Sequence, residues 1–291
     1  MAYRPDPAPF EEELAGLDAL EAKTPHPKSR ALHIWNSLWP KVAAIGIVLL
    51  AWQILVWAHW RPSYVFPGPG AAFGRLWRDL ASGRIPRAVG VTMERAALGY
   101  AIALTIGSAI GLAVARIPVL RAAVGSLITG LSTMPSVAWF PLAIVVFKLS
   151  ETAILFVVIL GAAPAIANGL IAGIDNVPPL LLRAGRVLGA RGVKSYRHVI
   201  LPAAFPSFLG GMKQGWAFAW RSLMAGELLV TIGGRAGLGF VLDSARLNSE
   251  YDALMAAMIV ILVIGIVVDS LVFGVIERRV RRRWGLIESV S

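Results

Sequence analysis

Three charged side chains, Lys213, Arg221 and Glu227, stand inside one long, otherwise apolar stretch of the sequence. A charge at the centre of a membrane helix costs about 2.5–3.5 kcal/mol on insertion scales, so it usually faces a partner or water. We therefore expect these side chains to line a polar path that offers positive charge to an anionic solute. The structural alternative is that they snorkel, or pair with Glu94, Asp269 or a second subunit.

The spacing of these residues gives the expected helix a polar face. At 100° per residue, Lys213, Trp220 and Glu227 fall on one stripe of the helix. Gln214 and Arg221 follow the same seven-residue spacing on a neighbouring stripe. All five residues are therefore candidates for a translocation pathway.

A second candidate site is the segment 183–202, R-A-G-R-V-L-G-A-R-G-V-K-S-Y-R-H-V-I-L-P, which is basic and rich in small residues. Ala184 and Gly185 permit close approach to another surface. Gly189 permits a turn between two short helices, and Pro202 suits the first turn of the next membrane helix. An ordinary basic loop is the simpler interpretation of this composition taken alone, and an element that docks on a partner is the alternative.

Several kinds of chemistry are excluded by what the sequence lacks. It has no cysteine, which excludes disulfides, thiolate metal sites and cysteine nucleophiles. Its four histidines show no metal-binding spacing, and no G-x-x-x-x-G-K-[ST] loop is present to hold a nucleotide phosphate. The glycines of residues 233–239 lack a preceding strand and favour a flexible outer turn. Ser132 and Ser136 have no histidine and carboxylate nearby, so we expect no nucleophilic catalysis, no metal and no cofactor bound by this chain.

The elements that must position these residues are membrane helices. Of 291 residues, 57% are apolar and 15% charged, with a mean hydropathy of +0.68, whereas an ordinary soluble domain carries about 25% charge. About 20 residues of helix cross the ~30 Å hydrocarbon layer. The composition therefore predicts an all-α integral membrane protein with about six transmembrane helices. The six apolar segments are 42–60, 88–115, 122–147, 151–173, 203–231 and 253–276.

Two stretches depart from a simple span. Pro135 and Pro141 lie inside the third segment and predict a kink or a partial break there. Residues 67–87 mix arginines such as Arg75 and Arg78 with apolar residues, which predicts an amphipathic surface helix on the outer side.

The basic residues indicate the orientation. With a cytoplasmic N-terminus, the inner segments hold 17 of the 28 basic residues, the outer loops hold eight, and three lie within spans. This bias predicts two cytoplasmic termini, and it explains the net charge of +11 without a nucleic-acid partner. The run Arg278–Arg283 is interpreted as a stop signal at an anionic membrane surface. The expected organisation is a mobile cytoplasmic tail with one short helix (1–40), a membrane domain (41–284) with a cytoplasmic loop (174–202), and a C-terminal tail (285–291).

Segment 183–202 resembles the cytoplasmic signature of ABC importer permeases, E-A-A-x-x-x-G followed after nine residues by I-x-L-P. Four further motifs extend the resemblance beyond this segment. They are F-P-G-P-G after the first span, S-T-M-P-S-V-A-W-F-P-L-A-I in the third, W with a following E-L-L in the fifth, and G-L-G-F before the sixth. Together they resemble the sulfonate, taurine, nitrate and bicarbonate uptake branch over roughly residues 64–284. The signature positions are Ala184, Gly189, Leu201 and Pro202, with Val199 as a conservative match, while Arg183 and Gly185 replace the glutamate and the second alanine.

The resemblance implies a permease-type fold in a bacterial inner membrane. It implies that the chain pairs with a second permease, expected to be a copy of itself, around one pathway. Two cytoplasmic ATPase subunits, which would bind ATP and Mg²⁺, would receive the 183–198 loop as a coupling helix, and an external binding protein would deliver the solute. In the family, the position of Lys213 is commonly basic and that of Glu227 commonly acidic, while Arg221 stands where many relatives are apolar. These features favour a small anionic solute.

Two other classes of protein remain as alternatives. A secondary transporter driven by an ion gradient would also have six apolar spans and would use Glu227 or Asp269 as relay groups, but it leaves segment 183–202 unexplained. An intramembrane enzyme would need paired catalytic groups at membrane depth, and the sequence offers no convincing pair.

Overall fold

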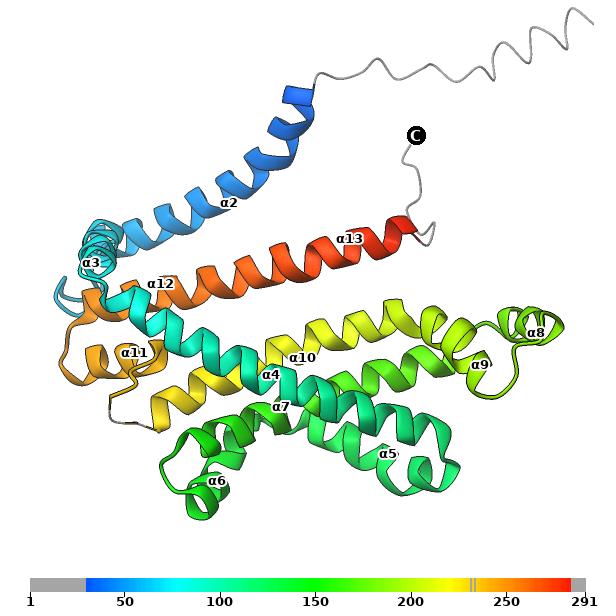
Figure 1. Ribbon diagram of the computed structural model, residues 1–291. Coiled ribbons are helices and arrows are strands. Elements are labelled where there is room, and N and C mark those ends of the chain that lie inside the picture. Colours follow the sequence, from blue (N-terminus) through cyan, green and yellow to red (C-terminus); the bar gives the residue numbers. More distant parts are fainter. Residues whose placement is uncertain (1–29, 231, 233, 284–291) are drawn as a thin grey trace, which may run out of the picture. The chain divides into compact units, whose positions relative to one another are not determined.

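The computed structural model describes residues 30–230, 232 and 234–283, and every regular element in these ranges is helical (Figure 1). Residues 1–29 of the predicted N-terminal tail and the predicted C-terminal tail 285–291 lie outside these residues. The elements are α2 (Arg30–Trp57), α3 (Pro69–Ala81), α4 (Arg84–Arg116), α5 (Pro118–Thr133), η1 (Ser136–Trp139), α6 (Phe140–Phe147), α7 (Glu151–Asp175), α8 (Pro179–Val187), α9 (Val193–Ser195), η2 (Tyr196–Ile200), α10 (Leu201–Leu229), α11 (Leu238–Leu247), α12 (Tyr251–Val267), η3 (Val268–Phe273) and α13 (Gly274–Arg283).

Helix α2 belongs, up to Leu55, to a unit separate from the rest of the chain. Its stretch Leu38–Trp57 is long and apolar enough to cross a membrane, in agreement with the predicted first span at 42–60. The helix begins at Arg30, so the last part of the predicted tail 1–40 is helical. A proline within it, Pro40, did not end the helix.

The second unit, residues 56–287, is built around α7, which packs against α4 and α10 (Figure 1). Glycines let these backbones approach closely, as is common where membrane helices cross. A Cβ added to Gly211 would lie 2.6 Å from the Cα of Gly169, and one added to Gly111 would lie 2.9 Å from the carbonyl oxygen of Ala167. Small residues on both sides of α7 therefore set the spacing of the three central helices.

This packing predicts different effects for two neighbouring glycines. Gly211→Ala is expected to destabilise the protein by about 1–3 kcal/mol, because the added methyl group cannot fit between α7 and α10. Gly210 faces open space, with nothing within 4 Å of an added Cβ, so Gly210→Ala is the matched control. Melting temperatures in detergent compare the two variants. Equal melting temperatures would contradict the close contact.

The third apolar segment is broken, as Pro135 and Pro141 predicted. α5 ends at Thr133, and the pair formed by α5 and η1–α6 is bent by 105°. Two serines next to the break bind the neighbouring helices: Ser136 accepts a hydrogen bond from Ser222 (2.7 Å), and Ser132 accepts one from Asn168 (3.0 Å). The S-T-M-P-S motif thus forms a fixed corner against α7 and α10.

The number of apolar spans differs from the six predicted. In the described residues, four helices are long and apolar enough to cross a membrane, or five if the bent pair is one span. The helix at the predicted fifth span, α10, is not among them. It has 29 residues, about 43 Å at 1.5 Å per residue, so its length suffices. The polar residues on its faces, Lys213 and Arg221 among them, lower its hydropathy.

The predicted outer helix at 67–87 is shorter than expected. α3 ends at Ala81, and residues 84–87 already belong to α4, after Gly83 turns the chain with φ of 73°. Arg75 of α3 donates hydrogen bonds to Asp79 (3.1 Å) and to Glu250 (2.6 Å), next to the start of α12. Burial by itself lowers the pKa of Arg75, but the carboxylates around it outweigh this and raise the pKa above its ordinary value.

Candidate functional site

Residues 179–200 form a compact projection, which we call the basic hairpin (Figure 1). Its first helix, α8, ends where Gly189 adopts a φ of 82°, a left-handed conformation that favours glycine. The amide of Ala190 donates to the carbonyl of Gly185 (2.8 Å), and that of Gly189 donates to Arg186 (3.1 Å). The predicted turn at Gly189 is therefore present.

The second half of the hairpin differs from the prediction of two separate short helices. α9 is a single short turn, and it continues through the π-helical turn η2 directly into α10, with helical backbone at Tyr196 and Leu201. π-helical turns inside longer helices occur frequently at functional sites. The hairpin is therefore joined to α10 by continuous helical backbone.

The signature residues divide between the inside and the outside of the hairpin. Gly185 is buried, and a Cβ added there would lie 2.8 Å from Val199 Cγ2. The predicted close approach of Gly185 is thus made within the hairpin rather than to another surface. Arg183, Ala184 and Gly189 are exposed. Leu201 and Pro202 begin α10, as predicted for the next membrane helix.

The tip of the basic hairpin carries large apolar side chains in the open. Leu188 is 85% exposed, Val187 88% and Val193 73%, and exposed basic residues such as Arg191 and Lys194 surround them. Grouped exposed apolar residues with a polar rim typically mark a protein interaction site. Sequence reasoning missed these three residues, although their positions beside Gly189 and Gly192 could have indicated them.

One contact joins the base of the hairpin to the end of α4, and a second joins the start of α5 to the end of α7. The guanidinium of Arg116 lies 3.8 Å from the ring centroid of Tyr196, a cation–π contact. Arg121 binds Asp175, at the end of α7, through a bond of 2.7 Å. The base of the hairpin thus contacts the end of α4, and α5 is bound to the end of α7. No local sequence pattern predicts these two pairs.

The two polar stripes of α10 have different surroundings. On the first, Lys213 pairs with Asp269 at 3.3 Å, which is one of the partners expected in the structural alternative. Trp220 is 9% exposed and stacks on Trp216. Glu227 is 1% exposed. This stripe is turned mostly toward the rest of the chain.

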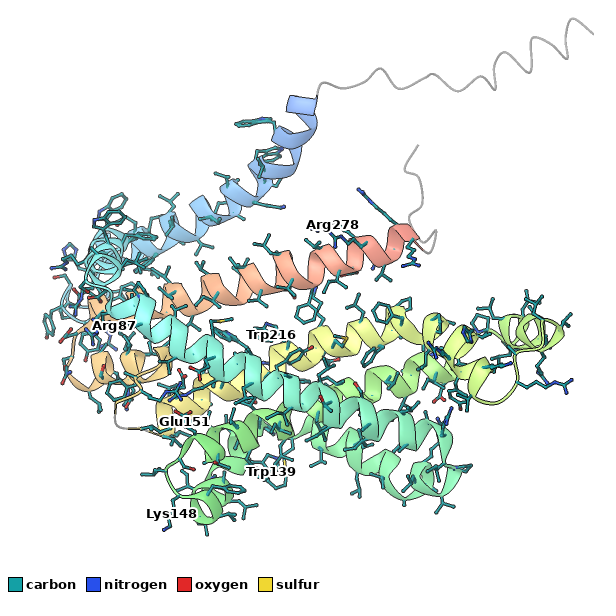
Figure 2. The ribbon with its side chains drawn as sticks, in the orientation of Figure 1. Arg87, Trp139, Lys148, Glu151, Trp216 and Arg278 are labelled. Carbon is teal, nitrogen blue, oxygen red and sulfur yellow. The ribbon has the colours of Figure 1, made fainter. Side chains whose placement is uncertain are left out.

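Glu227 lies in a buried network at one end of the central helices. It accepts hydrogen bonds from Thr92 (2.9 Å), Arg95 (2.8 Å) and the amide of Gly239 (3.0 Å). Arg95 also donates to Glu151 (2.7 Å), which lies at the first turn of α7 (Figure 2). The network joins α4, α7, α10 and the G-L-G-F segment at the start of α11. Glu227 therefore lies within the helix packing rather than on an open face.

The second stripe of α10 is open. Gln214 and Arg221 are both exposed, and Gly210 and Ala217 continue the same face with small residues. Arg221 donates to the carbonyl of Ala217 (3.2 Å), lies 4.8 Å from the ring centroid of Phe218, and forms no ion pair with any described residue. It borders an open cleft of 770 Å³ whose other walls, on α10, α11, α12 and η3, are mostly apolar but include Asp269, the partner of Lys213.

Comparisons with known proteins agree with this arrangement. Residues 101–282 match the family described as binding-protein-dependent transport system inner membrane component. The chain is 27% identical to the nitrate import permease NrtB of Leptolyngbya laminosa, over 81% of this chain and 77% of the relative. It is 29% identical to the taurine transport permease TauC of Escherichia coli, over 67% of this chain and 66% of the relative.

The fold also matches that of solved importers. The MetNI methionine ABC transporter matches with a TM-score of 0.57 at 21% identity, over 67% of this chain and 94% of that chain. An amino acid ABC transporter solved with histidines matches with a TM-score of 0.53 at 22% identity, over 70% of this chain and 97% of that chain. The family match covers more than half of the sequence, and the chain therefore belongs to the binding-protein-dependent inner membrane components, the permease subunits of ABC importers.

Proposed function

We propose that this permease imports a small anionic solute of the sulfonate, taurine, nitrate or bicarbonate type. Arg221 carries the proposal: it is a cation on the open face of α10, and no described acidic residue neutralises it. Gln214 adds a polar group seven residues away, about two helical turns, on the same face. The nitrate named for the NrtB relative is an anion, and the taurine named for the TauC relative carries an anionic sulfonate group, so both offer a negative group to Arg221.

In this proposal two copies of the chain face each other across one pathway, and ATP hydrolysis takes place in two separate ATPase subunits that hold ATP and Mg²⁺. The basic hairpin enters a surface groove on each ATPase, and an external binding protein delivers the solute.

The hairpin, the α4–α5 connection and the end of α13 lie at one end of the second unit (Figure 1). Because all three are basic, this common end supports a cytoplasmic location for them. The proposal places both termini on the same side.

Reconstitution into vesicles tests this function. The chain with its ATPase and binding protein is expected to take up the anion when ATP is enclosed on the ATPase side. Uptake by the chain alone, driven by a proton or sodium gradient, would instead establish the alternative of a secondary transporter.

Replacing Arg221 tests the anion selectivity. Arg221→Leu is expected to lower uptake of the anion at least about tenfold, because a charge-assisted hydrogen bond contributes about 1.5–3 kcal/mol. Arg221→Lys keeps the positive charge and should retain most of the uptake. Assembly with the ATPase, checked by co-purification, should be unchanged in both variants. Unaltered uptake by Arg221→Leu would leave Arg221 with a structural role only.

A further inference from the structure

A groove runs between the first turns of α10 and the helix α13. One part of it, of 390 Å³, lies between Phe205 of α10 and Arg279 and Arg283 of α13. A second part, of 540 Å³, continues along α10 past Leu209 to Lys213. Val280 lines both parts, so the two adjoin at this residue, and we call them together the groove.

Charged residues line both parts of the groove: Arg279 and Arg283 line the first part, and Lys213, Glu277 and Arg281 line the second. Lys213 pairs with Asp269 at 3.3 Å. Arg279 and Arg283 are exposed, and neither forms an ion pair with any residue in the described part of the chain. Arg281, in contrast, is neutralised by Glu277 at 2.7 Å. Two guanidinium groups without an ion pair to a described residue therefore stand at one end of the groove, where they can donate hydrogen bonds to a phosphate group.

The position of the groove relates it to the bilayer. α12, η3 and α13 form one helical stretch of 33 residues, Tyr251–Arg283, which contains an apolar window long enough to cross a membrane. The two arginines lie in its last turns, in the basic helix α13. Arginines in that position lie at the membrane–water interface. From Pro202 to Lys213, α10 extends about 16 Å, close to half of the ~30 Å hydrocarbon layer. The groove thus has the length of one leaflet, with its cationic end at the lipid headgroups.

We infer that this groove binds one anionic phospholipid. The headgroup phosphate lies between Arg279 and Arg283, and an acyl chain lies over Phe205, Val280 and Leu209. The lipid contacts α10 directly after the basic hairpin, so it holds α13 against the segment through which the hairpin moves α10. This inference is independent of the identity of the solute.

The purified full chain, titrated with phosphatidylglycerol or phosphatidylcholine in detergent, tests the site by native mass spectrometry. The double variant Arg279→Gln/Arg283→Gln is expected to weaken retention of phosphatidylglycerol about 30-fold, since two arginine contacts are lost. The matched control, Arg278→Gln/Arg282→Gln, removes the same charge from the same helix but from residues that do not line the groove. It should retain the lipid nearly as well as the unaltered chain.

A second variant leaves the charge unchanged. Val280→Trp fills the middle of the groove and is also expected to reduce retention of phosphatidylglycerol. Three results would overturn the inference. If both double variants lost phosphatidylglycerol equally, the lipid would be held only by the overall positive charge of the helix. If inorganic phosphate displaced phosphatidylglycerol, the groove would be a site for a free anion. Cross-linking of Val280→Cys to a second copy, in a chain that otherwise has no cysteine, would show that a partner subunit fills the groove.

Discussion

Leu188→Asp is expected to abolish ATP-driven uptake while the chain remains folded in the membrane. Leu188 stands at the tip of the basic hairpin, 85% exposed, and makes no contribution to the core of this chain. Burial of a leucine in the groove of an ATPase contributes about 1.5–3 kcal/mol. The aspartate loses this burial and adds a carboxylate that must be desolvated. Affinity for the ATPase should therefore fall by more than about 30-fold.

The measurements are co-purification of the ATPase and uptake into vesicles. Leu247→Asp is the matched control, because Leu247 is also a leucine at the end of a helix and is 68% exposed, but lies on α11. A single cysteine at position 188 should in addition cross-link to the ATPase. Normal uptake and a retained ATPase in Leu188→Asp would exclude the hairpin tip as the docking surface.

Arg95→Leu is expected to destabilise the protein by about 3–5 kcal/mol, the usual cost of removing one partner of a buried ion pair. Arg95 is 5% exposed and contacts both Glu227 and Glu151. Its removal leaves the buried carboxylate of Glu227 without a countercharge. Since native proteins are stable by only about 5–15 kcal/mol, the melting temperature in detergent should fall strongly.

A double variant separates charge from packing. Arg95→Leu combined with Glu227→Leu should be more stable than Arg95→Leu alone, because replacing a buried pair by apolar residues is often neutral. Arg246→Leu serves as the control, since Arg246 is an exposed arginine that pairs with Asp243, and such a pair contributes about 0–1 kcal/mol. A melting temperature of Arg95→Leu as high as that of Arg246→Leu would contradict a structural role for the network.

In the basic hairpin, local sequence patterns predicted some structural features and not others. Gly189 predicted the turn correctly, because a left-handed residue is a local property that glycine alone adopts without strain. The continuity of α9 with α10, and the contact of Arg116 with Tyr196, were not predictable in the same way. The two residues of that pair are far apart in the sequence, and nothing in the residues around either one requires the other.

The sequence by itself determined where the helices lie. In a bilayer each backbone polar group must be satisfied within its own helix, so apolar length and the prolines at 135 and 141 suffice to locate spans and breaks. Only the tertiary structure decided how α10 is rotated. The two polar stripes are offset by one residue, or about 100° around the helix axis. Packing against α4 and α7 turns Glu227 inward and leaves Arg221 outside. That choice depends on Arg95 and Thr92, which are 132 and 135 positions away from Glu227, and no local pattern records such distant partners.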